Sequence, residues 1–159
     1  MINRINQINW ESLGYRDMPQ LFEGLMSSEK GSRSWEQLEL HVTRPEVFDG
    51  TQSPIQTLSS ELPVVVLPFL IEMLDKHLSN DELRLIDNIS TLLKYYVDRD
   101  RFGQIYGLNE DQLSRTTKMY NIIKKNLVVF ERFSKHENTT ICLYANNLLT
   151  ELRKLAKSK

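Results

Sequence analysis

The chain has 159 residues, a single-domain length that can bury one continuous core. With 40% hydrophobic and 26% charged residues, its composition is ordinary for a globular protein in water. No apolar run reaches the roughly 18–20 residues of a membrane-spanning helix, the N-terminus lacks the apolar stretch of a secretory signal, and the single cysteine excludes an internal disulfide. We therefore expect one domain over residues 1–159, located in the cytoplasm, with no membrane partner.

The net charge of −1 conceals an uneven distribution. Residues 1–111 carry 18 acidic and 10 basic side chains, a balance of −8, whereas residues 112–159 carry 3 acidic and 10 basic ones, a balance of +7. Such asymmetry can mark a surface for a charged partner. The plainer interpretation, which we favour, is that the two ends of one protein carry differently charged solvated faces.

Two short amphipathic helices are expected in the first part of the chain. Asp17 can cap the first, and Pro19 is tolerated in its first turn. Its buried face comprises Leu21, Phe22, Leu25 and Met26. The partner helix is indicated by Trp35, Leu38 and Val42. Residues 43–53, "TRPEVFDGTQS", predict a loop, and Ser53 followed by Pro54 is typical of a helix start.

The stretch "LPVVVLPFLIEML" over residues 62–74 decides the fold class. It is too short to span a bilayer, and a central strand would lose a ladder hydrogen bond at both Pro63 and Pro68. A helix that begins at Pro63 and bends at Pro68 reduces both penalties. Because the stretch is apolar on nearly every side, we expect a kinked helix in the middle of the protein.

From residue 80 onward the apolar spacing is helical. Ser79 and Glu82 predict a capping box for the first helix, whose stripe comprises Leu83, Ile86, Ile89, Leu93 and Val97. Gly103 and Gly107 suggest a loop over residues 98–109. A second helix is expected from Asn109, with a stripe that comprises Leu113, Tyr120, Ile123, Leu127 and Phe130. A third is expected from Asn138, with Ile141, Tyr144, Leu148, Leu152 and Leu155 on one side.

Three segments share a pattern of paired apolar positions with a glutamate near the end: "MPQLFEGLM", "LPFLIEML" and "LVVFERF". After a polar break, each is followed by a second amphipathic helix: "RSWEQLELHV", "DELRLIDNISTLLKYYV" and "TTICLYANNLLTELRKL". Helix pairs that recur at intervals of roughly 50–60 residues predict an all-α stack in which each pair buries its face against the next. The expected fold is therefore all-α, with stacked antiparallel helix pairs in about three irregular repeats.

On these segments, together with "INWESL", the chain from Asn9 onward resembles small bacterial HEAT-repeat-like proteins, which are α-solenoids. It departs from a regular array at Val128, where the third unit would carry proline, and at "SEKGSRS", which lacks an Asp-Pro turn. The resemblance implies a protein-binding scaffold. Some proteins of this kind are immunity proteins that bind and block a bacterial toxin, and the resemblance implies this role as a specific form.

No motif with catalytic or metal-binding spacing is present. The sequence lacks G-x-S-x-G, P-loop and G-x-G-x-x-G patterns. His41, His77 and His136 lie far apart and are expected at the surface or at helix ends. Cys142 lies in an apolar helix pattern and is expected to be a small buried side chain. We expect no enzyme activity, no metal or cofactor, and no small-molecule substrate.

Aromatic and charged side chains alternate around "YYVDRDRF", as at many protein-binding surfaces. Asp98 and Asp100 could form an acid–base pair, but their alternation with arginines favours a solvated ion-pair loop. The structural alternative places Tyr96 in the core and leaves Tyr95 as an isolated exposed ring. The candidate partner-binding residues, from this segment and from loop 43–53, are Tyr95, Asp98, Arg99, Asp100, Arg101, Phe102, Tyr106, Glu46, Phe48 and Asp49.

The expected function is the binding of another protein. In its specific form, the chain blocks a toxin sterically, and the acidic part of the chain suits a toxin with a basic surface. General scaffolding is the broader form. A nucleic-acid-binding alternative, which we consider less favoured, relies on a basic stripe that comprises Lys118, Lys124, Lys125, Arg132, Lys135, Arg153, Lys154, Lys157 and Lys159. An enzyme without a recognisable motif is a third alternative.

Overall fold

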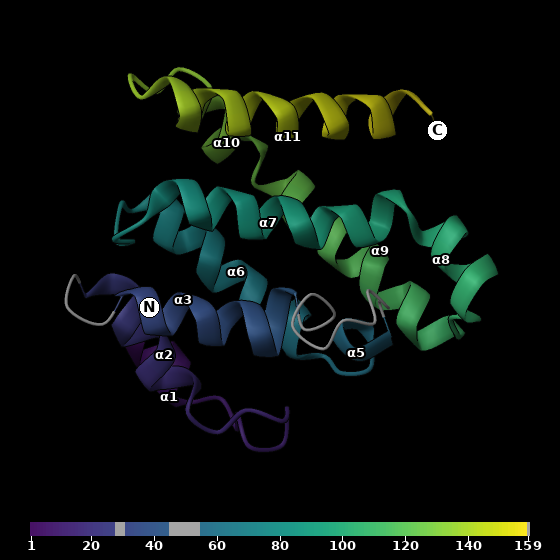
Figure 1. Cartoon of the computed structure of the whole chain (residues 1–159), viewed down its shortest axis with the longest axis horizontal. Helices are drawn as coiled ribbons and strands as arrows, with labels where there is room; N and C mark the ends of the chain where they lie inside the picture. The colour runs from purple at the N-terminus through teal and green to yellow at the C-terminus, as the bar shows by residue number, and fades with distance from the viewer. Residues whose placement is uncertain (28–30, 45–54, 159) are drawn as a thin grey trace.

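The computed structural model describes residues 1–27, 31–44 and 55–158. These residues are mostly helical and contain no strand, so the predicted all-α class is confirmed for them. Within the described ranges, no helix is both long enough and apolar enough to cross a membrane. In chain order (Figure 1), the elements are α1 (Ile2–Asn6), α2 (Met18–Met26), α3 (Gly31–Leu38), the π-helical η1 (Glu39–Thr43), α5 (Ile55–Leu58), α6 (Leu62–Asp75), α7 (Glu82–Val97), α8 (Arg99–Tyr106), α9 (Glu110–Lys125), α10 (Leu127–Phe133) and α11 (Thr139–Lys157).

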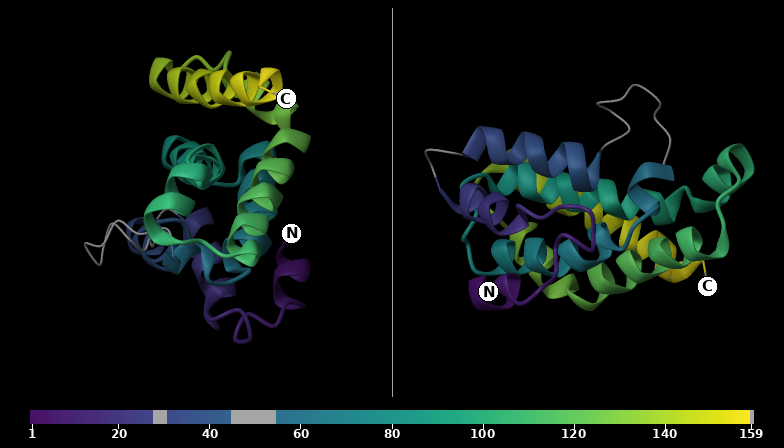
Figure 2. Two further views of the ribbon diagram at one scale, coloured as in Figure 1. Left: turned by 90° about the vertical axis from the view of Figure 1, so that its right-hand side faces the viewer. Right: turned by 90° about the horizontal axis from the view of Figure 1, so that it is seen from below.

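The three paired segments of the sequence each form two packed helices. Helix α2 packs on α3, α6 on α7, and α10 on α11. The second members of the pairs lie one above another in Figure 1 and run in the same direction, with α7 in contact with both η1 and α11. Helices α5, α8 and α9 belong to none of these pairs, and α9 packs against both α6 and α7. Figure 2 shows α9 beside α6, to one side of α3 and α7.

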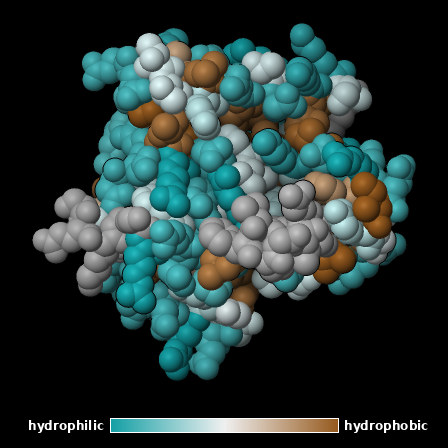
Figure 3. All heavy atoms as spheres, in the orientation of Figure 1, coloured by the Kyte–Doolittle hydropathy of each residue, from teal (hydrophilic) through white to brown (hydrophobic). Residues whose placement is uncertain are grey.

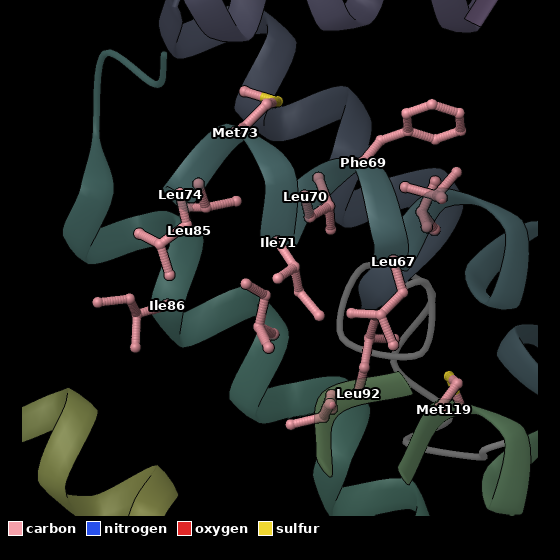
Figure 4. Close-up of a cluster of buried hydrophobic side chains, with 14 of the residues drawn as sticks. Leu67, Phe69, Leu70, Ile71, Met73, Leu74, Leu85, Ile86, Leu92 and Met119 are labelled. Atoms are coloured by element: carbon pink, nitrogen blue, oxygen red, sulfur yellow. The ribbon is translucent and has the colours of Figure 1, made fainter. Parts of the chain in front are cut away.

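Helix α6 is the centre of the core, as "LPVVVLPFLIEML" predicts. It contacts α7, α9, α10 and η1, and the helix continues through Pro68, whose ring is exposed. Side chains from α6, α7 and α9 meet in one apolar cluster, in which Leu74 lies beside Leu85 (Figure 4). On another side, the Phe69 ring lies 5.7 Å from Phe22 and 6.3 Å from Trp10. Burial on most sides explains why the stretch carries so few polar residues.

A buried polar network joins η1 to α7, and the sequence analysis did not anticipate it. The Thr43 hydroxyl donates to Asn88 Oδ1 at 2.5 Å, and both side chains are fully buried. Asn88 Nδ2 and Arg84 Nε both donate to Glu39 Oε1, at 3.3 and 2.6 Å. Burial alone would raise the pKa of Glu39, but the hydrogen bonds from Arg84 and Asn88 outweigh it and hold that pKa below its ordinary value. The network fixes η1 against α7 because the buried Thr43 and Asn88 side chains find their hydrogen-bond partners across it.

The helix starts confirm the cap predicted at Asn109 and the start expected near Asn138, and they correct two other predicted caps. Asp17 lies at the N-cap position of α2, but its side chain makes no capping hydrogen bond. Asn109 and Gln112 form a reciprocal capping box at α9, and the Asn138 side chain accepts from two backbone N–H groups at the start of α11. The box predicted at Ser79 is wrong, because Asp81 caps α7 by accepting from Arg84 N at 3.0 Å. Ser79 instead accepts from Asp81 N at 3.1 Å, so it supports the turn before the cap.

Two predicted boundaries in the middle of the chain also differ. Residues 98–109 are not a loop, because Arg99–Tyr106 forms α8 and only the following residues leave the helix. Gly103 is accommodated inside α8, whereas Gly107 ends it at φ 68°, a left-handed conformation that favours glycine. The stripe expected from Asn109 to Phe130 belongs to two helices, because the chain leaves the helix at Asn126, whose side chain donates to the Ile122 carbonyl at 2.8 Å.

Candidate functional site

A groove of about 450 Å³ lies between α7 and α11 on the surface of the protein. Its floor is apolar and its rim is polar and charged. In Figure 3, hydrophobic atoms are visible along the band between α11 and α7. The lining residues are Asp87, Ser90, Leu93, Lys94, Val97, Asp98, Tyr144, Asn147, Leu148 and Glu151.

Helical periodicity explains why these residues share one groove. On each of the two helices the lining residues recur three and four apart, which places them on one side. Because α7 and α11 run side by side in the same direction (Figure 1), the two rows face a common space. Leu93 and Leu148 are each only 2% exposed and belong to the seam between the helices, whereas Val97 and Tyr144 are half-buried. The half-buried pair therefore supplies the apolar surface that a partner can still cover.

The charges on the rim differ in how far they are already neutralised. Asp87 pairs with Arg44 at 2.5 Å, and Glu151 pairs with Lys154 at 3.0 Å. Among the described residues, neither Lys94 nor Asp98 has a side-chain hydrogen bond or ion pair. The end of the groove near Asp98 and Glu151 therefore carries two carboxylates, with Lys94 one turn before Asp98 on α7.

The predicted partner-binding segment continues directly from this end into α8. Asp98 lines the groove, and Asp100 and Arg101 are exposed on α8. Arg99 is held against the protein, with its guanidinium 4.0 Å from the Tyr96 ring centre and its Nη1 2.7 Å from the Tyr96 carbonyl oxygen.

The three aromatic candidates differ in exposure. Phe102 and Tyr106 are half-buried, with their ring centres 6.2 Å apart. The structural alternative is confirmed for Tyr96, which is buried, and is wrong for Tyr95, which is only 8% exposed and leaves almost none of its ring for a partner. Glu46, Phe48 and Asp49 lie outside the described residues. Ile105, which lies in α8 between the candidates Phe102 and Tyr106, is 58% exposed, and the sequence analysis did not select it.

Sequence analysis missed the groove because its residues were assigned to core stripes. Val97 and Tyr144 lie at the edges of the stripes on their helices, and the pattern alone does not separate an edge position from a central one. Lys94 and Glu151 belong to no sequence motif that would mark them as binding residues. Only the side-by-side arrangement of α7 and α11 turns the two edges into a groove.

The histidines and the cysteine lie in structural positions. His77 follows α6 at φ 53°, with Nδ1 3.1 Å from Glu82 Oε1. His136 stacks on Phe133 and accepts from Asn138 N at 3.0 Å. Cys142 is half-buried, with its thiol donating to the Ser134 carbonyl oxygen at 3.0 Å, and is less buried than expected. No group of histidine, cysteine and acidic side chains suited to a metal ion occurs in the described ranges.

The basic stripe of the C-terminal third is partly neutralised by the rest of the protein. Of its members, Lys118 pairs with Glu61 at 3.3 Å and Arg132 with Asp75, and Arg115, which is outside the stripe, also binds Glu61 at 3.0 Å. Burial alone would raise the pKa of Glu61, but hydrogen bonds from Arg115 and Lys118 outweigh it and lower that pKa. These contacts withdraw part of the stripe from a nucleic-acid backbone.

Comparison with known proteins adds no further assignment: no family model matches the chain, and neither a curated protein nor a solved structure does.

Proposed function

We propose that this chain is a non-enzymatic protein-binding helical-repeat protein of HEAT-like architecture. The packing of three successive helix pairs, with α7 between η1 and α11, supports this architecture. The irregularity of the stack comes from α5, α8 and α9, which lie outside the pairs.

The observation that carries the proposal is the groove that α7 and α11 form. Its floor is apolar and its rim is charged, and the chain leads from Asp98 at its end into α8, which carries the exposed Ile105. An apolar centre with a polar rim is the usual anatomy of a protein interface. The two helices also position this surface rigidly, because both pack on the core through buried leucines.

In its narrower form, the proposal is that the protein is an immunity protein that covers the active site of a bacterial toxin. The support is the acidic balance of residues 1–111, which would complement a basic partner such as a nuclease. The test is co-expression with a toxin encoded beside its gene. Growth rescue is expected from the wild-type chain, and absent rescue with no co-purified toxin would contradict this narrower form.

Protein binding itself can be tested by site-specific photo-crosslinking in the native host. A photoreactive amino acid replaces Ile105 on α8, and a matched chain carries it at the exposed Glu23 on α2, which does not line the groove. We expect one partner to crosslink at position 105 and not at position 23. The absence of any crosslinked protein at position 105 would remove the proposed function.

A further inference from the structure

The backbone around the groove limits what can bind in it. The groove lies between two helices whose backbone groups are engaged in their own hydrogen bonds, and the described part of the chain has no strand edge. An extended peptide would therefore find no backbone partners in the groove and would leave its own N–H and C=O groups unpaired against an apolar floor. A helical segment pairs these groups internally.

The dimensions of the groove match a helix as well. From Asp87 to Asp98 the α7 side of the groove spans eleven residue steps, about 16 Å at the helical rise, or three turns. The rows of lining residues, three and four apart, form ridges between which the side chains of a third helix can pack. The half-buried Val97 and Tyr144 would meet the apolar stripe of such a helix.

Charge then restricts the chemistry of that helix. At the end of the groove, the Asp98 carboxylate has no partner among the described residues, and Glu151 has only an exposed contact with Lys154. An exposed pair of this kind contributes little, so Glu151 can exchange its partner at small cost. At the other end, Arg44 already neutralises Asp87, and the cation of Lys94 lines the groove one turn before Asp98. The favourable occupant therefore presents a cation to Asp98 and Glu151.

We propose that the α7–α11 groove binds an amphipathic helix of a partner protein, with an apolar stripe on Val97 and Tyr144 and a lysine or arginine toward Asp98 and Glu151. This inference rests on the proposed protein-binding function and names the class of segment bound. A second copy of this chain is an alternative occupant that the test separates.

The probe is a fluorescein-labelled leucine–lysine peptide of about 14 residues, with leucines at helical spacing, a length that covers the groove. Two further peptides serve as comparisons, one with glutamate in place of lysine and one with the same composition at alternating spacing. Fluorescence anisotropy with the full chain should show the helical lysine peptide binding at least tenfold more tightly than either. Similar affinity of all three would overturn the inference.

Variants of the chain locate the binding. Tyr144→Ala and Val97→Ser should each weaken binding of the lysine peptide at least fivefold. Asp98→Asn combined with Glu151→Gln should weaken it at least threefold and reduce its dependence on salt. Leu143→Ala is the matched control, since Leu143 is 56% exposed on α11 and does not line the groove; it should leave binding unchanged. Unchanged binding of the lysine peptide by both Tyr144→Ala and Val97→Ser would overturn the inference.

A measurement on the wild-type chain avoids any dependence on variant folding. Backbone amide NMR signals of Val97 and Tyr144 should shift on titration with the lysine peptide, and that of Leu143 should not. Shifts confined to other surfaces would overturn the inference, as would a wild-type dimer in sedimentation that Val97→Ser dissociates. If a partner crosslinks at position 105 but is indifferent to Tyr144→Ala, the groove inference fails and the proposed function stands.

Discussion

The Tyr95 hydroxyl lies 3.1 Å from the Thr57 hydroxyl and donates a hydrogen bond to the Thr43 carbonyl oxygen at 3.3 Å. Thr43 ends η1 and Thr57 lies in α5, so one side chain of α7 joins the two elements that flank residues 45–54 in the sequence. All three residues are buried. The role that the structure supports for Tyr95 is therefore to fix η1 and α5 on α7.

Replacing Tyr95 by phenylalanine should destabilise the protein by about 1–3 kcal/mol, because the Thr43 and Thr57 oxygens stay buried and lose this partner. Urea unfolding measures the change. Tyr144→Phe is the matched control, since no hydrogen bond of its hydroxyl occurs within the described residues, and it should change stability by less than about 0.5 kcal/mol. Equal effects of the two substitutions would contradict a special role for the Tyr95 hydroxyl.

Acid should weaken the protein partly through Glu39. The pKa of Glu39 in the folded protein lies below its ordinary value of 4.5, so the unfolded chain binds a proton more readily. The resulting stability is complete above that ordinary value and is lost as the pH falls through the lowered pKa. Glu39→Gln should be less stable than the wild type at neutral pH and should lose less stability between about pH 6.5 and 3.5.

Urea unfolding at several pH values checks this prediction, with Glu23→Gln as the control. Glu23 is exposed on α2 and forms no ion pair within the described residues, so its replacement should leave the pH dependence as in the wild type. The free energy of unfolding of Glu39→Gln will still depend on pH, because the pKa of Glu61 and that of Glu72 are also lowered by their basic partners despite burial. If the stability of Glu39→Gln depended on pH as strongly as that of the wild type, the role of Glu39 in acid destabilisation would be refuted.

Local sequence signals predicted the helices well where one residue decides the structure. Asn109 caps α9 as expected and α11 begins after Asn138 as expected, because an asparagine side chain can pair the free N–H groups of the first turn wherever the helix packs. At α7 two residues compete, and the signal did not distinguish Ser79 from Asp81. Gly103 misled the prediction of a loop, since the cost of a glycine inside a helix is only about 1 kcal/mol and contacts of α8 with α7 and α9 can offset it.

The candidate site was predicted only in part, because it depends on which helices become neighbours. Asp98 lies at the groove as a candidate residue, but Tyr95 is turned inward and Arg99 is stacked on Tyr96. Alternating charged and aromatic residues indicate a possible surface and do not say which side of a helix the core takes. Tyr144 is 49 positions further along the chain than Tyr95, and only tertiary packing brings α11 to the edge of α7.

The seam beneath the groove should contribute strongly to stability. Leu93→Ala and Leu148→Ala should each cost about 2–5 kcal/mol, since both leucines are only 2% exposed and their removal leaves a cavity between α7 and α11. Leu143→Ala provides the comparison on the same helix and should cost far less, because that side chain is largely exposed. Thermal or urea unfolding measures all three. Wild-type stability in either seam variant would show that the leucine is not part of the core.

Arg99 and Asp98 are neighbours in sequence, and we expect them to affect different properties. The Arg99 guanidinium lies 4.0 Å from the Tyr96 ring centre, and Tyr96 stacks in turn on Tyr120 of α9, with ring centres 4.3 Å apart and an interplanar angle of 4°. A double-mutant cycle of Arg99→Ala and Tyr96→Leu should therefore give a coupling of roughly 0.5–1 kcal/mol in unfolding measurements.

Asp98→Asn tests the other half of that contrast. The Asp98 carboxylate lines the groove and has no partner among the described residues. Its replacement should therefore leave the free energy of unfolding within about 0.5 kcal/mol of the wild-type value, and it should still weaken the binding of the helical lysine peptide. Arg99→Ala should lower stability and leave peptide affinity unchanged, since Arg99 does not line the groove. If instead Arg99→Ala reduced affinity and Asp98→Asn did not, the binding surface would lie on α8 and not between α7 and α11.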